Sequence, residues 1–479
     1  MSALAIEHVP PAKQPQFFGH PLGLFILFFT EMWERFSYYG MRGLLKAYMV
    51  YYLVSSFGAA LYRSDFPEPP AEAPSNPFNV LGYDFLLLLP DWIVAKTSVQ
   101  DFASSMYGLY TALVYATPFF GGILADRWLG QRKAVYIGGI VMALGHFVMA
   151  SEQLFLLALG LLIVGNGFFK PNISTQVGEL YEQGDPRRDG AFTIFYMGIN
   201  LGAFLCNLVC GTLAAIYGWH YGFGAAGIGL VIGLVVYFFG QKYLAAEKPR
   251  AEKAKEEAAH GPLNSEDWLK VCALCALCVL NIAFWAVYEQ QGNTMQTWAD
   301  TQTNWPVILG FQIPPNWFQS FNPLMIFVLA PFLDMFWRWQ AKSGSEPTSV
   351  GKMAIGSTVL GLSFIIMVVG ANLIGDGNRG SLFWPFACVL ILTVGELYLS
   401  PIGLSLVTKV SPPRIVSMMM GMWLASSFLG NFLSGWIGTF YDDMTKDQFF
   451  LLLCAIGVST GAAMWAFNKP LKKALGGHV

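Results

Sequence analysis

Charged residues are scarce in this chain of 479 residues, since Asp, Glu, Lys and Arg together make up 12%. Soluble globular domains carry about 25%, so the composition excludes an ordinary soluble protein. The mean hydropathy is +0.48 and 55% of the residues are apolar. These values indicate a protein whose environment is the lipid bilayer, and we expect no nucleic-acid partner.

Histidine and cysteine are also few. The six histidines are scattered, and the sequence holds no G-x-S-x-G, H-E-x-x-H or phosphate-binding loop, so we expect no enzyme and no cofactor. The seven cysteines are odd in number and lie mostly in apolar segments, which implies no disulfide framework. "CALCALC" (272–278) has the spacing of metal ligands but lies inside an apolar span without a fourth ligand nearby. We therefore expect no metal site.

The apolar residues form dense runs rather than the alternating pattern of a β-barrel. A membrane-spanning helix needs about 20 apolar residues, and twelve segments of that kind follow one another. We expect spans near 21–57, 101–124, 134–151, 153–178, 191–216, 219–241, 267–291, 321–339, 352–372, 382–407, 415–437 and 448–468.

Lys and Arg are distributed unevenly between the two sides of these spans. Twenty of the 28 fall on the side that holds both chain ends, four fall on the opposite side and four lie within spans. The positive-inside rule then predicts a multi-pass protein of the cell (inner or plasma) membrane with both termini in the cytoplasm.

One long charged stretch, residues 242–266, divides the twelve spans into six and six. We expect an N-terminal six-helix bundle at 1–241, a cytoplasmic linker at 242–266 and a C-terminal six-helix bundle at 267–479. Residues 58–100 form an outside insertion, which begins rich in Pro and acid and then turns apolar; we expect it to lie as a surface element on the outer face. Two bundles joined by a linker are typical of secondary transporters, whose halves rock around a central site.

The first span contains five charged residues despite the cost of charge in a bilayer. On a helical wheel of about 100° per residue, these charges and Tyr38 share a stripe about 120° wide, which must face partner helices or a cavity. A purely structural ladder would explain a contact between Glu31 and Arg35 but would leave positive charge without partners. The five charged residues are Glu31, Glu34, Arg35, Arg42 and Lys46.

Further charges interrupt other spans. Lys170 precedes Pro171 in the fourth span, and Glu396 lies one turn before Pro401 in the tenth, the equivalent place of the second half. Paired helices broken at matching positions point to a binding site, so we expect both helices to be interrupted. Positive charge in the first half and negative charge, including Glu289, in the second half suit a zwitterionic ligand.

Several motifs carry a family resemblance. "GGILADRWLGQRK" (121–133) resembles the cytoplasmic motif of the major facilitator superfamily, and "APFLDMFWRWQAK" keeps Asp334 and Arg338 as an echo in the second half. "EMWERFSYYG", "FFKPNIS", "FYMGINLGA", "FWAVYEQ" and "GELYLSPIGLS" resemble, in order, motifs of the proton-dependent oligopeptide transporter (POT/PTR) family. The resemblance implies an all-α membrane protein with the major facilitator fold, twelve transmembrane helices in two six-helix bundles.

The resemblance also implies a peptide-binding site. Arg35 and Lys170 would hold the peptide carboxylate and Glu396 its amino terminus, with asparagines on the peptide backbone and aromatic residues around its side chains. The implied binding residues are Arg35, Tyr38, Tyr39, Tyr110, Lys170, Asn200, Trp285, Asn322, Glu396, Ser400 and Trp423.

Proton coupling and gating follow from the same resemblance. Animal members carry a histidine in the second helix that this chain lacks. We therefore expect carboxylates beside arginine, rather than a histidine, to bind the coupled proton. The implied coupling residues are Glu31, Glu34, Arg35 and Glu289, the outer gate pair is Arg42 with Glu289, and the inner gate pair is Lys170 with Glu396. Lys46 lies outside the family motif and receives no role.

These expectations combine into proton-coupled symport of di- and tripeptides by alternating access, in a monomer with the proton as coupling ion. Transport of another small anion or zwitterion, such as nitrate or a carboxylated metabolite, is an open alternative. A sensory receptor of transporter shape is another, because binding without flux leaves the same sequence pattern.

Overall fold

The computed structural model describes residues 9–54, 72–181, 185, 187–245, 263–375, 377–412 and 415–474. Parts of two expected segments therefore lie outside the described residues, namely 58–71 of the outside insertion and 246–262 of the linker. The side chain of Asp126, in the major facilitator motif, also lies outside the description.

Twelve long helices account for the expected spans. Within the described residues, nine of them are long and apolar enough to cross a membrane, and α1, α4 and α14 are the other three. α1 differs because of its five charges. The twelve are α1 (Leu22–Tyr48), α3 (Val99–Leu124), α4 (Gln131–Val148), α5 (Phe155–Glu179), α6 (Arg187–Tyr217), α7 (Trp219–Gly240), α9 (Ser265–Tyr288), α11 (Phe321–Lys342), α12 (Ser349–Ile374), α13 (Phe383–Val410), α14 (Val416–Gly438) and α15 (Lys446–Ala474).

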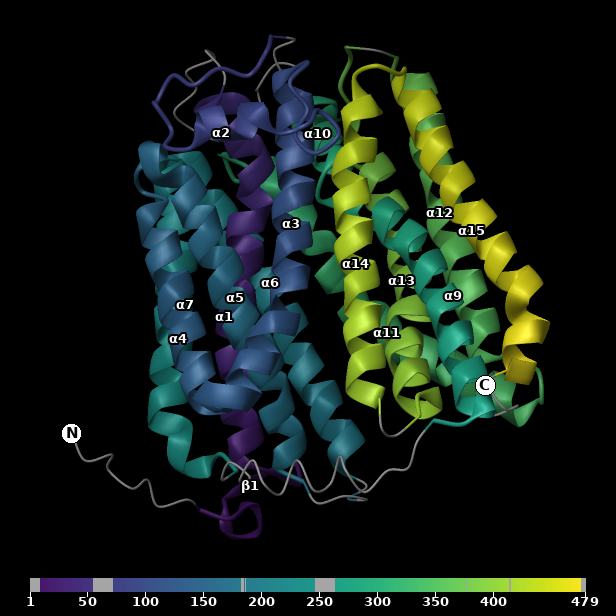
Figure 1. Cartoon of the computed structure of the whole chain (residues 1–479). Coiled ribbons are helices and arrows are strands. Elements are labelled where there is room, and N and C mark those ends of the chain that lie inside the picture. The colour runs from purple at the N-terminus through teal and green to yellow at the C-terminus, as the bar shows by residue number, and fades with distance from the viewer. Residues whose placement is uncertain are drawn as a thin grey trace.

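Short elements occupy the two ends of the molecule. The short helices α2 (Tyr83–Leu88) and α10 (Thr294–Thr301) lie at one end, and β1 and the C-terminal end of α15 lie at the other (Figure 1). We call these the outer and the inner end, following the orientation that the sequence predicts. The two-residue strands pair as β1 (Gln16–Phe17) with β2 (His20–Pro21), β3 (Thr303–Asn304) with β6 (Gly380–Ser381), and β4 (Val307–Ile308) with β5 (Phe311–Gln312).

Tight or widened turns join or extend the helices. π-helical turns continue α1 and α3 at their C-terminal ends, and Gly130, with φ of 78°, makes the turn into α4. The turns are η1 (Pro11–Lys13), η2 (Met49–Leu53), η3 (Ala125–Leu129), η4 (Glu152–Leu154), η5 (Gln241–Tyr243), η6 (Glu289–Gln291), η7 (Pro315–Ser320) and η9 (Thr439–Tyr441).

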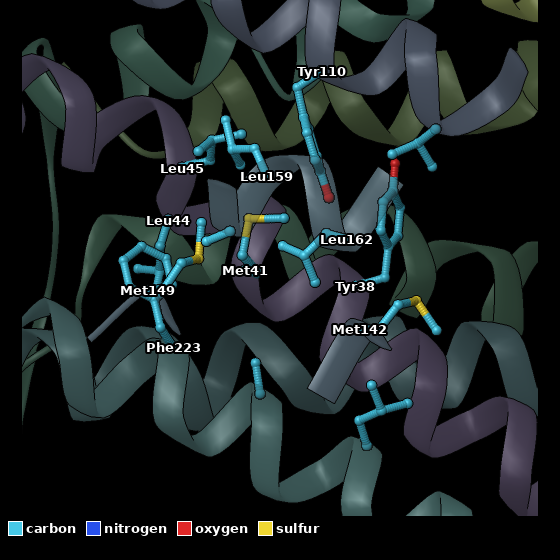
Figure 2. Packing of buried hydrophobic residues seen from close by; sticks show 14 of the residues in the cluster. Tyr38, Met41, Leu44, Leu45, Tyr110, Met142, Met149, Leu159, Leu162 and Phe223 are labelled. Carbon is cyan, nitrogen blue, oxygen red and sulfur yellow. The ribbon is translucent and has the colours of Figure 1, made fainter. Parts of the chain in front are cut away.

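The buried apolar side chains form two clusters. One contains residues between Leu24 and Leu244, and the other contains residues between Val271 and Met464. Figure 2 shows part of the first cluster, where side chains of α1 such as Met41 and Leu45 lie among residues from α3, α4, α5 and α7. Each half of the chain therefore has a core of its own.

The expected interruption of two helices is wrong. α5 runs through Pro171 and α13 runs through Pro401 without a break. Proline is tolerated inside membrane helices because neighbouring helices and polar side chains satisfy the backbone groups that it frees. The chain breaks instead at η6, where α9 ends at Tyr288 and the path turns into α10.

Candidate functional site

The charged stripe of α1 meets α5 in a buried network of two carboxylates and two cations. Arg35 contacts Glu34 through two nitrogens, with Nη2 donating to Oε1 at 2.7 Å, and its Nε lies 3.3 Å from Glu31 Oε1. Lys170 Nζ donates to Glu31 Oε1 at 2.6 Å. The four charges balance, so the network is held by mutual neutralisation within the membrane.

Glu31 is the most enclosed member of this network, with none of its surface exposed. One of its oxygens, Oε1, faces both cations, whereas Oε2 has no hydrogen-bond partner among the described residues. A buried carboxylate oxygen without a donor is costly. The arrangement leaves Oε2 as the position where a proton would add without displacing an existing bond.

A cavity of about 180 Å³ lies between the two halves of the chain. Its wall includes residues of α1, α3 and α6 from the first half and of α9, η6, α11 and α13 from the second. The lining residues are Tyr39, Arg42, Gly43, Tyr115, Tyr196, Ile199, Asn200, Ala203, Asn207, Trp285, Tyr288, Glu289, Gln291, Gly292, Gln319, Asn322, Pro323, Ile326, Glu396 and Ser400.

Glu396 is the carboxylate of the cavity wall in α13. Asn322 of α11 donates to Glu396 Oε2 at 2.7 Å, and the same amide nitrogen lies 3.0 Å from Thr393 Oγ1. Tyr288 in turn donates to Asn322 Oδ1 at 3.4 Å. Among the described residues, no Lys or Arg lies within 4 Å of Glu396. The carboxylate is thus held in place by an amide while its charge stays without a cation.

The outer end of the cavity is closed by contacts between the halves. Arg42 Nη2 donates to Glu289 Oε2, and Arg42 Nε donates to the Tyr107 hydroxyl at 2.7 Å. Farther along, α3 and α14 touch through their backbones, since a Cβ at Gly108 would lie 2.4 Å from the Cα of Gly435. The Arg42–Glu289 pair and the Gly108–Gly435 contact join the first half of the chain to the second, whereas the Arg42–Tyr107 bond lies within the first half.

The expected inner pair is not formed in this conformation. Lys170 contacts Glu31 instead, and Glu396 accepts from Asn322. In an alternating-access transporter, a conformer closed at its outer end would have the outer pair, Arg42–Glu289, formed and the inner pair, Lys170–Glu396, separated. The Lys170–Glu396 contact therefore stays a prediction for the opposite conformer.

Other expected binding residues lie away from the cavity wall. Tyr38 and Tyr110 are buried among Leu and Met side chains of the first cluster (Figure 2). Trp423 is buried against α13, where a Cβ at Gly403 would lie 2.3 Å from its ring. Arg35 and Lys170 are not lining residues of the cavity and contact Glu34 and Glu31 instead. The expected residues that line the cavity are Tyr39, Asn200, Trp285, Asn322, Glu396 and Ser400, together with the gate residues Arg42 and Glu289.

The structure adds cavity residues that the sequence reasoning missed. Tyr196 lies one turn before Asn200 on α6, so the helical period was a signal that could have found it. Tyr288 stands beside Glu289 in a motif that was already recognised. Gln319 lies in η7, just before the span expected at 321–339, and no sequence pattern marks it.

Comparison with known proteins identifies the family. A family model described as the POT family matches residues 132–264 and 262–457. The chain belongs to the POT family. It is 33% identical over 490 residues to the "Peptide transporter YePEPT" of Yersinia enterocolitica, covering 88% of each chain. It is 31% identical over 524 residues to the "Di-/tripeptide transporter" of Lactococcus lactis subsp. cremoris, covering 96% of this chain and 97% of the relative.

A solved structure extends the likeness to three dimensions. The crystal structure of a mutant of peptide transporter POT in complex with alafosfalin superposes with a TM-score of 0.78 at 33% identity, covering 96% of this chain and 97% of that chain. The predicted major facilitator fold and membership of the POT family are confirmed. The chain is a multi-pass membrane protein of a transporter family, not of an enzyme family.

Proposed function

We propose that this POT-family protein is a proton-coupled symporter of di- and tripeptides. The observation that carries the proposal is Glu396, a carboxylate on the cavity wall that an amide positions and no described cation neutralises. Such a group favours an ammonium, and the amino terminus of a peptide supplies one. The names of the Yersinia and Lactococcus relatives support the same substrate class.

The opposite pole of the ligand would be met by Arg35 and Lys170. Both cations are occupied by Glu34 and Glu31 in this conformer, so a peptide carboxylate competes with those side chains. A carboxylate that loses its cation in the membrane gains affinity for a proton. Peptide binding and protonation of Glu31 or Glu34 are thereby linked without a cofactor, with the proton as coupling ion.

Alternating access would be carried by two bundles, 1–241 and 267–479, joined by the cytoplasmic linker 242–266. The two separate apolar clusters support this division, because each half can move without repacking its own core. The Arg42–Glu289 pair would close the outer end and the Lys170–Glu396 pair the inner end. The proposed working unit is a monomer, because both halves of one chain contribute residues to the cavity wall.

The proposed setting is the cell membrane with both termini in the cytoplasm. The excess of Lys and Arg on the side of the chain ends supports it.

Uptake of labelled dialanine into proteoliposomes, with and without an inward proton gradient, tests the function. We expect dialanine to accumulate above its equilibrium concentration only with the gradient. One proton moving across 100 mV supplies about 2.3 kcal/mol, which would support a roughly fifty-fold ratio of inside to outside dialanine. Binding without flux would favour a receptor. Flux of nitrate or a carboxylated metabolite that excess dialanine leaves unchanged would favour the other transporter class.

A further inference from the structure

Lys46 is a buried cation of α1 that the proposed peptide and proton sites do not use. It follows Arg42 by one turn on the charged stripe, toward the outer end, and only 3% of its surface is exposed. Its Nζ donates to Asn293 at two places, to Oδ1 at 2.6 Å and to the backbone carbonyl at 3.2 Å. Asn293 lies at the turn between η6 and α10, in the second half of the chain.

Asn293 is itself fixed to a third element. Its Nδ2 donates to the Ser434 carbonyl of α14 at 3.2 Å, and α14 passes so closely that a Cβ at Gly438 would lie 2.3 Å from that nitrogen. The Lys46 contact therefore connects the two halves of the chain at the same end as the Arg42–Glu289 pair.

The two outer contacts differ in how the buried charge is compensated. Arg42 has the carboxylate of Glu289, whereas Lys46 has two neutral oxygens and, among the described residues, no carboxylate within 4 Å. The carboxylates of Asp101, Asp300 and Asp442 attract it and the ammonium of Lys446 repels it, all from longer range. An ammonium removed from water without a paired charge raises the free energy of the state that buries it.

We propose that Lys46 biases the outer gate toward opening, while Asn293 limits that bias. Closing the gate removes water from the ammonium and replaces it with the two Asn293 oxygens, and opening restores the water. The charge thus favours the open state and the hydrogen bonds favour the closed state. The inference rests on the alternating access of the proposed function and assigns a role to a residue outside the peptide and proton sites.

The proposal predicts opposite effects for two substitutions. Lys46→Met keeps the length of the side chain and removes the charge, so the closed state no longer buries an ammonium and is favoured. Asn293→Ala keeps the charge and removes its side-chain acceptor, so the closed state is disfavoured. A contact that only latched the gate would be lost in both variants, and both would then open.

Accessibility of an engineered thiol measures the opening directly. Ser104 of α3 is fully buried against α14 near Gly435 and Gly438, so Ser104→Cys in the full-length protein reacts with a membrane-impermeant maleimide only when the outer gate opens. The same protein without this cysteine gives the background of the seven native thiols. We expect labelling roughly tenfold slower with Lys46→Met and roughly tenfold faster with Asn293→Ala.

Matched variants complete the test. Lys96→Met makes the same chemical change at a lysine that contacts Asp91 and the Leu89 carbonyl in its own half, and it should leave labelling unchanged. Lys46→Gln is a second neutral variant should the methionine impair folding. Faster labelling in both the neutral Lys46 variant and Asn293→Ala, or no change in either, would overturn the proposal. Because labelling needs no peptide, a failure of dialanine uptake would be seen separately.

Discussion

Individual charged residues show how this protein keeps charge inside a membrane. Glu31, Glu34, Arg35 and Lys170 neutralise one another, and Arg42 has Glu289. The network of four charges joins α1 to α5, and the Arg42–Glu289 pair joins α1 to η6. A movement of one of these elements relative to α1 therefore separates charges that now neutralise each other. Under the proposed function, a network of this kind would respond to a proton or a ligand.

The carboxylates beside Arg35 give the first prediction. Glu31→Gln and Glu34→Gln remove the protonatable group while keeping the size of the side chain, so each should abolish gradient-driven uptake of dialanine. Peptide exchange between two loaded compartments should remain, because exchange needs no net proton movement. Concentrative uptake at the parent rate in both variants would contradict the assignment of coupling to these residues.

The outer pair gives the second prediction. Arg42→Glu and Glu289→Arg alone place like charges together and should each reduce uptake strongly. The double reversal restores opposite charges, and the Tyr107 hydroxyl, which now accepts from Arg42, can donate to a carboxylate instead. Uptake by the double variant should exceed that of either single variant. A double variant no better than the worse single one argues against the pair.

At the scale of elements, glycines decide how closely helices of opposite halves approach. Gly108 of α3 and Gly435 of α14 touch through their backbones at the outer end, where a side chain on either would meet main-chain atoms. Main-chain atoms cannot move aside as a flexible side chain can, so this contact sets how completely the outer end closes.

The third prediction tests this contact. Gly108→Ala would place a Cβ 2.4 Å from the Gly435 Cα, and overpacking of this kind costs about 1–3 kcal/mol. The outer-closed state should lose population, and dialanine uptake should fall roughly tenfold.

Gly160→Ala is the matched control, because a Cβ at this α5 position meets nothing within 4 Å. Removing a helical glycine should leave uptake unchanged and stabilise the protein by up to about 1 kcal/mol. Thermal unfolding of both variants separates a shift of the gate from a loss of folding. Equal uptake by the two variants would show that the α3–α14 contact does not limit closure.

The elements also show where sequence reasoning succeeded and failed. Length and hydropathy placed the twelve helices, because a bilayer demands about 20 apolar residues per span. The prolines at matching positions of the two halves predicted breaks at Pro171 and Pro401 that do not occur. The effect of a proline on a membrane helix depends on the neighbouring helices and side chains, which the sequence does not place. The break between α9 and α10 at η6 has no proline, so no such signal marks it in the sequence.

At the scale of the whole molecule, the cavity belongs to neither half alone. Tyr39 and Asn200 come from one half and Asn322 and Glu396 from the other. A ligand held at both ends therefore ties its binding to the relative position of the halves, which is the property that alternating access needs.

The fourth prediction concerns that ligand. Blocking the amino terminus of a dipeptide removes the ammonium that Glu396 would pair with. Blocking the carboxylate removes the group that would compete with Glu31 and Glu34 for Arg35 and Lys170. Loss of a buried ionic partner costs about 3–5 kcal/mol or roughly 200- to 5000-fold in affinity. N-acetyl-dialanine and dialanine amide should therefore compete far less well than dialanine against labelled dialanine, whereas exchanging one small side chain for another should matter little. If both blocked peptides competed as well as dialanine, Arg35, Lys170 and Glu396 would not bind the two termini of the peptide.

The sequence by itself determined the membrane class, the number of spans, the stripe of charges on α1 and the family resemblance, because each depends on local composition, period or motif. The tertiary structure decided which charges meet. It paired Lys170 with Glu31 rather than Glu396, placed Tyr38 and Tyr110 in the core rather than on the cavity wall, and gave Lys46 its partner in Asn293. Partners such as Lys46 and Asn293 are 247 residues apart in the chain, so only the packing of the two halves brings them within hydrogen-bond distance.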